Sequence, residues 1–324
     1  MNDLLVEIDQ GFSTRDRRLV GGKGLALIEL SQRKIPVPPG FVLTTNAYDL
    51  FLRENDLGQR ISGISVTENL EGVLGGIRKA VLDAPMPEEL LSGIELFVKR
   101  SKIKRYAVRS SADVEDSAKK SWAGVFESYL NVPQSGVVNA TKRCWASVFS
   151  STVVRYAKSL GQIPRIKMAV IVQESINSDV SGVCFTRDPL DNKKDDIRIE
   201  AVFGLGEALV QGKVTPDSYA VERGSNVILE INVQPQKIAY VNKKSGGTKL
   251  VALKPRYNQK LPGEEIIRLV TIAQTIENGY GVGQDIEWCK KGGNMYILQS
   301  RPITSGNQKQ RQSGRSDALR ANFS

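Results

Sequence analysis

One stretch near the end of the chain restricts most strongly how this sequence can fold. Two segments of alternating side chains, 284–289 and 295–302, flank adjacent glycines, which supply the positive φ angles that a tight hairpin turn needs. Because side chains alternate between the two faces of a strand, antiparallel pairing with an even register sum places Glu287, Gln299 and Arg301 on one face. The opposite face is then expected to carry the apolar side chains of Ile286, Trp288, Tyr296 and Leu298.

The polar face of this hairpin has the chemistry of a cation and phosphate site. A carboxylate and an amide oxygen suit a hard cation, and a guanidinium suits the phosphate oxygens that such a cation bridges. A half-exposed hairpin with an ordinary salt bridge has the same pattern, and these residues alone do not decide between the two. The sequence contains no histidine, which excludes a Ser-His-Asp triad, a Cys-His pair, a histidine metal site and a phosphohistidine within this chain.

Composition narrows the class of protein. The 324 residues are enough for two or three lobes, and 40% hydrophobic with 25% charged residues is typical of a soluble globular protein. No apolar run is long enough for a bilayer, and the N-terminus lacks the features of a signal peptide, so we expect a cytoplasmic protein with no membrane partner. The cysteines, which are expected to be buried small side chains rather than disulfide or zinc ligands, are Cys144, Cys184 and Cys289.

The charge of the chain favours anionic partners. Its formal net charge is +10 and its pI is near 9.4. The basic residues are spread along the sequence, without a helix-turn-helix, a zinc finger or an RNP-like aromatic string. A polyanionic small molecule such as a nucleotide fits the charge as well, and a solvated basic surface without a specific partner is the remaining alternative. We expect no nucleic-acid partner.

Two further stretches have residues suited to phosphate. Residues 19–31 read as an apolar lead-in, a glycine-rich turn and a helix, with Lys23 as a mobile positive charge beside free backbone donors. The spacing is not that of a Walker A loop. Arg109 follows a predicted strand and precedes two hydroxyls, so it could hold phosphate, although pairing with nearby acidic residues is equally consistent with the pattern.

Other segments predict structure more than chemistry. Residues 121–130, which include Gly124, read as a small-residue turn and a strand, and a flexible hairpin over a ligand would have this pattern. Residues 167–173 predict a buried strand ending at Gln173, which could present its amide to a purine. Gly204 and Gly206 begin a possible dinucleotide fingerprint, which requires glycine or alanine at position 209. That position is Leu209, which disfavours dinucleotide binding of the Rossmann type.

Several short motifs follow one another along the chain. They are VGGKG at 20–24, PGF at 39–41, VRSSA at 108–112, ED at 115–116, CWAS at 144–147, SGV at 181–183, GLGE at 204–207, TPD at 215–217, QDIEW at 284–288 and LQSRP at 298–302. In this order they resemble the N-terminal ATP-binding domain of the phosphoenolpyruvate synthase and pyruvate phosphate dikinase family, which rifampicin phosphotransferase shares.

The resemblance implies an α+β fold of the ATP-grasp type, in which two lobes close on ATP. It implies a first lobe over residues 1–184 and a second lobe with the metal site over 185–304. Residues 305–324 are polar and basic with few apolar anchors, so we expect a disordered tail or linker.

The resemblance also assigns roles. Glu287 and Gln299 are implied to bind Mg²⁺, Lys23 and Arg109 to hold phosphates, and Arg301 to stabilise the transferring group. Those last three are the implied catalytic residues. The residues implied to contact ATP are Lys23, Arg109, Gly124, Gln173, Glu287, Gln299 and Arg301, with Gln173 near the adenine.

In the family, ATP loses its β and γ phosphates as a unit to a histidine on a separate domain, and AMP is released. The chain is therefore expected to be the ATP-binding component of a phosphoenolpyruvate synthase-like phosphotransferase, incomplete without a phosphohistidine protein or missing C-terminal domains. One alternative is a catalytically idle nucleotide-binding regulatory module, and another is part of a phenylphosphate synthase-like or rifampicin phosphotransferase-like system. Departures from the family pattern at Val125, Ser151, Thr152 and Ser175 leave the idle module open.

Overall fold

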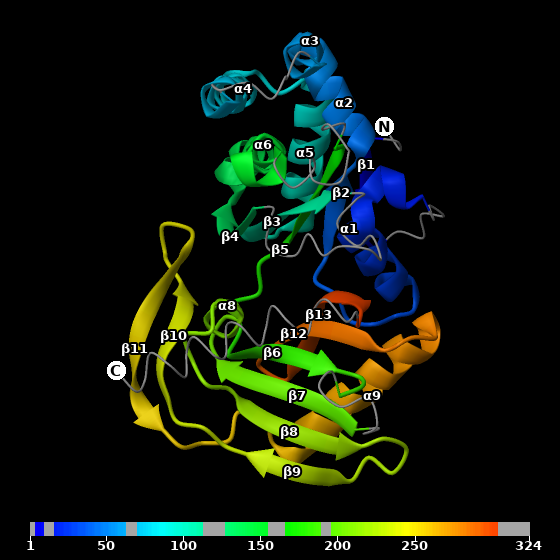
Figure 1. Ribbon diagram of the computed structural model, residues 1–324, viewed down its shortest axis with the longest axis vertical. Coiled ribbons are helices and arrows are strands. Elements are labelled where there is room, and N and C mark those ends of the chain that lie inside the picture. Colours follow the sequence, from blue (N-terminus) through cyan, green and yellow to red (C-terminus); the bar gives the residue numbers. More distant parts are fainter. Residues whose placement is uncertain are drawn as a thin grey trace. The chain divides into compact units, whose positions relative to one another are not determined.

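The computed structural model describes residues 4–9, 16–62, 70–112, 127–154, 166–188 and 196–303 (Figure 1). The chain forms two compact units. Unit 1 comprises residues 1–28, 39–175 and 245–247, and unit 2 comprises residues 29–38, 176–244 and 248–324. The units divide after Ser175 rather than at the expected residue 184, because the strand at 180–185 pairs entirely within unit 2. Each unit combines helices with antiparallel strands, so the expectation of an α+β fold is confirmed.

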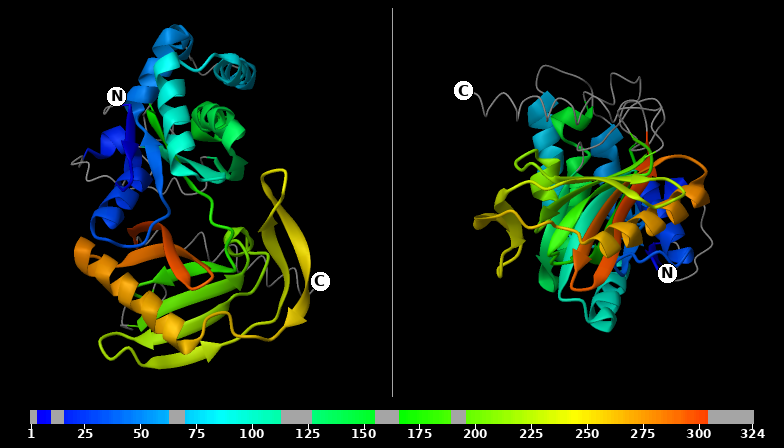
Figure 2. Two further views of the ribbon diagram at one scale, coloured as in Figure 1. Left: turned by 180° about the vertical axis from the view of Figure 1, so that it is seen from behind. Right: turned by 90° about the horizontal axis from the view of Figure 1, so that it is seen from below.

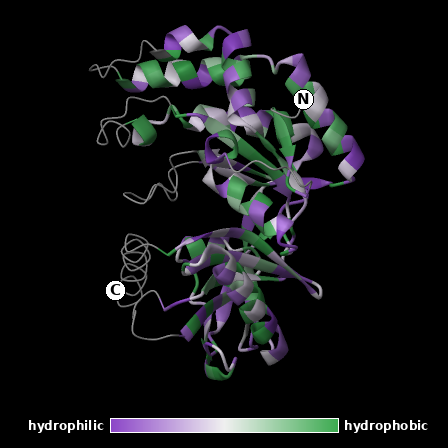
Figure 3. Cartoon of the chain, turned by 90° about the vertical axis from the view of Figure 1, so that its right-hand side faces the viewer, coloured by the Kyte–Doolittle hydropathy of each residue, from purple (hydrophilic) through white to green (hydrophobic). Residues whose placement is uncertain are grey.

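Unit 1 is built on a five-stranded sheet of order β1-β2-β5-β3-β4, in which every described pairing is antiparallel. The strands are β1 (Leu5–Glu7), β2 (Gly40–Leu43), β3 (Arg105–Ala112), β4 (Ser128–Pro133) and β5 (Met168–Glu174). The helices are α1 (Arg17–Gln32), α2 (Thr45–Glu54), α3 (Leu57–Ser62), α4 (Leu70–Asp83), α5 (Glu88–Ser101) and α6 (Val137–Ser147), with a short 3₁₀ turn, η1 (Gln134–Gly136). The helices of the chain mix hydrophobic and hydrophilic positions along their length, as expected for helices that cover a sheet (Figure 3).

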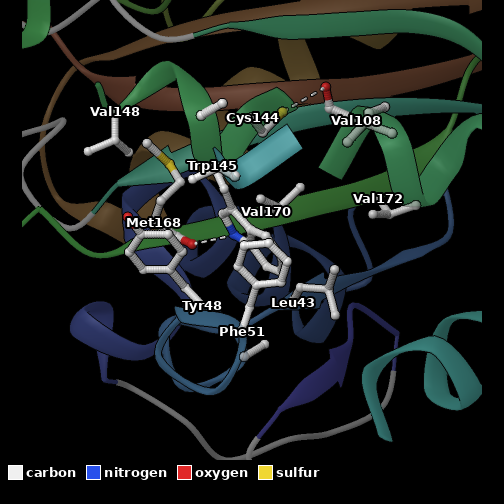
Figure 4. Packing of buried hydrophobic residues seen from close by; sticks show 14 of the residues in the cluster. Leu43, Tyr48, Phe51, Val108, Cys144, Trp145, Val148, Met168, Val170 and Val172 are labelled. Atoms are coloured by element: carbon white, nitrogen blue, oxygen red, sulfur yellow. Dashed lines mark hydrogen bonds between the residues drawn. The ribbon is translucent and has the colours of Figure 1, made fainter. Parts of the chain in front are cut away.

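The core of unit 1 is organised around Trp145 of α6 (Figure 4). Its ring lies 4.8 Å from that of Phe51 and 5.9 Å from that of Tyr48, measured between centroids. Its indole N–H donates to the backbone carbonyl of Met168, 3.1 Å away, so this polar atom is satisfied although the side chain is fully buried. The core thereby ties α2 and α6 to the central strand β5.

Unit 2 is built on a six-stranded antiparallel sheet of order β13-β12-β6-β7-β8-β9. Its helix α9 lies across one face of this sheet (Figure 2) and buries a continuous apolar stripe against it. The helix begins at Gly263, and Gly281, whose φ is 72°, is its left-handed C-cap. The elements are β6 (Val180–Phe185), β7 (Asp196–Phe203), α8 (Glu207–Val210), β8 (Asp217–Glu222), β9 (Ile228–Asn232), α9 (Gly263–Tyr280), β12 (Gln284–Lys291) and β13 (Asn294–Pro302).

A second, two-stranded sheet in unit 2 pairs β10 (Gln236–Asn242) with β11 (Thr248–Arg256). A two-stranded ribbon has little stability alone, so its attachment matters. The buried amide of Gln236 accepts from the N–H of Phe203 at 2.8 Å and donates to its carbonyl at 2.9 Å. These two bonds fasten the ribbon to the end of β7.

Two buried carboxylates hold unit 2 together. Asp217 accepts from the side chain of Lys260 at 2.5 Å and from its backbone N–H at 2.9 Å, and both side chains are 0% exposed. The motif TPD is thus a structural clamp between β8 and the approach to α9. Glu277 of α9 accepts from Arg187 and Arg223, each at 2.9 Å. Among the described residues, none of the helices has the length and apolarity needed to cross a bilayer.

Candidate functional site

The hairpin of β12 and β13 has the expected even register over residues 284–287, and the register shifts between Glu287 and Trp288. Glu287 lies directly opposite Gln299, and Asp285 lies directly opposite Arg301. Directly opposed residues of an antiparallel pair project to the same face, so these four polar side chains share one face of the sheet. The two-residue turn contains Gly292 with φ 56°, which confirms the expected need for a positive φ.

The apolar face of the same hairpin differs from expectation at two positions. A β-bulge follows Glu287, so that Trp288 pairs with Ile297 rather than with Leu298. Ile286 and Trp288 enter the core as predicted, but Met295 and Ile297 enter it in place of Tyr296 and Leu298. Because of the one extra residue in β13, the residues between the bulge and the turn project to the face opposite the expected one.

Asp285 is the residue of this face that the sequence analysis left without a role. It is 2% exposed, and its Oδ2 atom accepts from Nε of Arg301 at 3.1 Å and from Nη2 at 3.0 Å. Charge-assisted bonds of this kind fix the direction of a guanidinium as well as stabilise it. The same register arithmetic that pairs Glu287 with Gln299 would have found this pair.

Glu287 and Gln299 offer one carboxylate and one amide oxygen on adjacent strands. The described residues contain no cluster of three or more acidic, cysteine or histidine side chains placed to enclose a metal ion. This donor set fits Mg²⁺, which is usually bound by one or two carboxylates together with substrate phosphates and water rather than by a complete protein cage. It does not fit a structural zinc site.

In unit 1, the glycine-rich segment interrupts α1 instead of preceding it. Gly21 has φ 71° and ψ 171°, and a Cβ atom there would lie 2.1 Å from the backbone oxygen of Ser111. The hydroxyl of Ser111 accepts from the N–H of Gly24 at 3.0 Å and donates to the carbonyl of Val20 at 2.9 Å. The side chain of Ser111, which belongs to the VRSSA motif at 108–112, therefore fastens the kink to the end of β3.

This clamp brings two of the predicted phosphate residues into one neighbourhood. Lys23 follows the kink, and its Nζ atom lies 3.4 Å from the carbonyl oxygen of Ser110. Arg109, the preceding residue of β3, is partly exposed on the same strand. Although 86 positions separate Lys23 from Arg109 (109 − 23), the fold places the Nζ atom of Lys23 beside Ser110, the residue that follows Arg109 in β3.

Gln173 lies in the centre of the unit 1 sheet. Its strand, β5, pairs with β2 on one side and β3 on the other, and the residue is 2% exposed. The adjoining Glu174 has its pKa raised by burial. Contact of Gln173 with adenine stays a prediction, and Gly124, like Val125, lies outside the described residues.

The three cysteines are buried and form no disulfide, as predicted. Burial raises the pKa of each thiol. Cys144 and Cys184 are 0% exposed. A raised pKa disfavours the nucleophilic thiolate. Cysteine chemistry is thus disfavoured at these positions.

Comparison with known proteins identifies the family of this chain. The family model described as pyruvate phosphate dikinase, AMP/ATP-binding domain, matches residues 17–320. A probable phosphoenolpyruvate synthase of Archaeoglobus fulgidus is 39% identical over 316 residues, covering 93% of this chain and 41% of that protein. A probable phosphoenolpyruvate synthase of Methanocaldococcus jannaschii is 35% identical, covering 90% and 26%. Rifampicin phosphotransferase of Bacillus subtilis is 34% identical, covering 89% and 34%.

The chain therefore spans less than half the length of each of these curated relatives. The motifs that carry the resemblance at 20–24, 108–112, 284–288 and 298–302 fall within the matched range. The chain belongs to the pyruvate phosphate dikinase AMP/ATP-binding domain family.

Proposed function

We propose that this chain is the ATP-binding component of a phosphoenolpyruvate synthase-like phosphotransferase. It binds Mg-ATP in an ATP-grasp fold and passes phosphoryl groups to a histidine on another domain or polypeptide, with release of AMP. The family membership and the names of the relatives support this proposal.

One observation carries the proposal furthest. On the polar face of β12 and β13, the Glu287–Gln299 pair lies next to the Asp285–Arg301 pair, two residues away along each strand. The first pair has the oxygen ligands of Mg²⁺, and the second presents a guanidinium held by a buried carboxylate. Glu287 and Gln299 would hold a divalent ion, which would supply neutralisation of the charge that develops as the phosphoryl group transfers.

The chain's own residues then have separate tasks. Arg301 orients and neutralises the transferring group, and Asp285 keeps its guanidinium in one orientation. Lys23 and Arg109 bind phosphate oxygens, which suits the position of the Lys23 Nζ atom beside Ser110, the residue after Arg109 in β3. Phosphoryl transfer depends on positioning and electrostatics more than on acid-base catalysis, so a domain without histidine can support it.

The acceptor follows from the same composition. Since this sequence has no histidine, a phosphohistidine must be formed on a different domain or chain. The relatives, of which this chain covers 26–41%, have ample length for such a domain.

The test is a phosphoryl transfer assay. The chain is incubated with Mg²⁺ and ATP labelled in its β-phosphate, with and without the purified histidine domain of the Archaeoglobus fulgidus relative. We expect AMP and an acid-labile labelled histidine domain, and neither product with the Glu287→Gln variant. Binding of Mg-ATP without AMP in the presence of histidine domains from several relatives would instead favour the idle regulatory module.

A further inference from the structure

One row of directly opposed residues runs from the proposed metal site across the sheet of unit 2. Glu287 of β12 lies opposite Val183 of β6, which lies opposite Glu200 of β7, which lies opposite Ser218 of β8. Directly opposed residues in antiparallel strands project to the same face. Glu200 and Ser218 are therefore on the face that carries Glu287 and Gln299.

The alternation of β7 confirms which face this is. Its neighbours Ile199 and Ala201 are fully buried in the cluster that packs against α9 (Figure 2), so Glu200 projects to the other side of the sheet. Glu200 and Ser218 are both half-buried. A carboxylate and a hydroxyl thus lie side by side on the face opposite the helix.

The adjacent row on this face has a different chemistry. There Arg198 of β7 forms ion pairs with Asp188 at 3.1 Å, Asp196 at 3.5 Å and Glu230 at 3.2 Å. Those three acidic residues serve a structural network around one arginine. Glu200, by contrast, belongs to the row of the proposed metal ligands.

The spacing suits a ligand that is bound at both ends. Strands of a sheet lie about 4.8 Å apart, so two strand spacings separate Glu287 from Glu200 by roughly 10 Å. A nucleotide whose phosphates are held at Glu287 presents its ribose hydroxyls at a distance of this order. Carboxylates are well suited to accept hydrogen bonds from ribose hydroxyls, as acidic residues do in dinucleotide sites.

We propose that Glu200, supported by Ser218, binds the ribose hydroxyls of the nucleotide and makes the site selective for ribonucleotides over deoxyribonucleotides. This inference rests on the proposed function, because the phosphate end of the nucleotide is assigned to Glu287. It adds a sugar-binding residue on β7, a strand for which the sequence analysis predicted no ligand contact.

The experiment compares Mg-ATP with Mg-2′-deoxy-ATP by calorimetric titration of the full chain. Wild type should bind ATP about tenfold more tightly than its deoxy analogue, since a hydrogen bond to a charged group is lost. Glu200→Ala should weaken ATP binding by about 10- to 100-fold and abolish the preference, because the removed partner no longer distinguishes the two ligands. Glu200→Gln keeps the size of the side chain and should retain part of the preference.

The matched control is Glu222→Ala, which removes an exposed carboxylate from β8 and should leave both affinities unchanged. If both Glu200→Ala and Glu200→Gln keep the wild-type ratio of the two affinities, even with weaker binding of both nucleotides, this inference is overturned and the proposed function stands. Failure of the wild-type chain to bind Mg-ATP at all would overturn the proposed function, and the inference with it.

Discussion

Gly21 is the position where one added methyl group should disturb unit 1 most. Its φ of 71° and ψ of 171° lie in a region of backbone conformation that is essentially restricted to glycine. An alanine Cβ would also lie 2.1 Å from the backbone oxygen and 2.3 Å from the Oγ atom of Ser111. The clamp formed by that hydroxyl cannot move away without losing its bonds to Val20 and Gly24.

The expected loss follows from two contributions. Holding alanine in this conformation costs about 1–3 kcal/mol. Overpacking against a backbone atom costs about 1–3 kcal/mol more. The lower entropy of the unfolded alanine chain offsets about 0.4–1 kcal/mol of this, so Gly21→Ala should lower the free energy of unfolding by roughly 1–6 kcal/mol.

The assay is urea unfolding of the full chain followed by circular dichroism, with Gly58→Ala as the matched control. Gly58 lies in helix α3, and a Cβ atom there meets nothing within 4 Å. That substitution should be neutral or stabilise by up to about 1 kcal/mol. If the free energies of unfolding of the Gly21→Ala and Gly58→Ala variants differ by less than about 0.5 kcal/mol, the account of the kink is refuted.

Three further outcomes follow from buried charges. Lys260→Met leaves the carboxylate of Asp217 buried without its cation and should lower the free energy of unfolding by about 3–5 kcal/mol in the same urea assay. Asp285→Asn should reduce AMP formation about 10- to 100-fold in the transfer assay, because Arg301 loses a charged partner worth about 1.5–3 kcal/mol, while the urea midpoint is measured to separate lost folding from lost activity. Burial raises the pKa of Glu277, but hydrogen bonds from two arginines outweigh it and the net pKa lies below the usual 4.5. Its stabilisation is therefore present above pH 4.5 and lost as the pH falls through the lowered pKa, so thermal melting of Glu277→Gln should decline less than that of wild type over this acidic range.

Much of the fold can be predicted from periodicity in the sequence. The apolar run at 167–173 and the stripe that begins at Gly263 correspond to β5 and α9, because a buried strand and an amphipathic helix each impose a period on their side chains. The shared face of Glu287 and Gln299 agrees with the even register sum that the sequence analysis assumed, and the β-bulge after Glu287 produces that register.

Other features depend on contacts that a linear pattern does not contain. The bulge after Glu287 moves Ile297 into the core, and nothing in the alternation of β13 marks the extra residue. Residues 29–38 belong to unit 2 because Leu30 and Ile35 pack with its helix and sheet, a contact that no local pattern in the sequence marks. Similarly, the role of Ser111 depends on a partner 87 residues away.

The most direct test of the central claim is Mg²⁺-dependent stabilisation of the chain by ATP. At a free ligand concentration of 100 times Kd, binding should stabilise the chain by about 2.7 kcal/mol and raise its melting temperature. Glu287→Ala should abolish the part of this shift that requires Mg²⁺, whereas Glu264→Ala, an exposed carboxylate on α9, should leave it intact. A Mg²⁺-dependent shift of wild-type size in Glu287→Ala would contradict the assignment of the metal site to the β12–β13 hairpin.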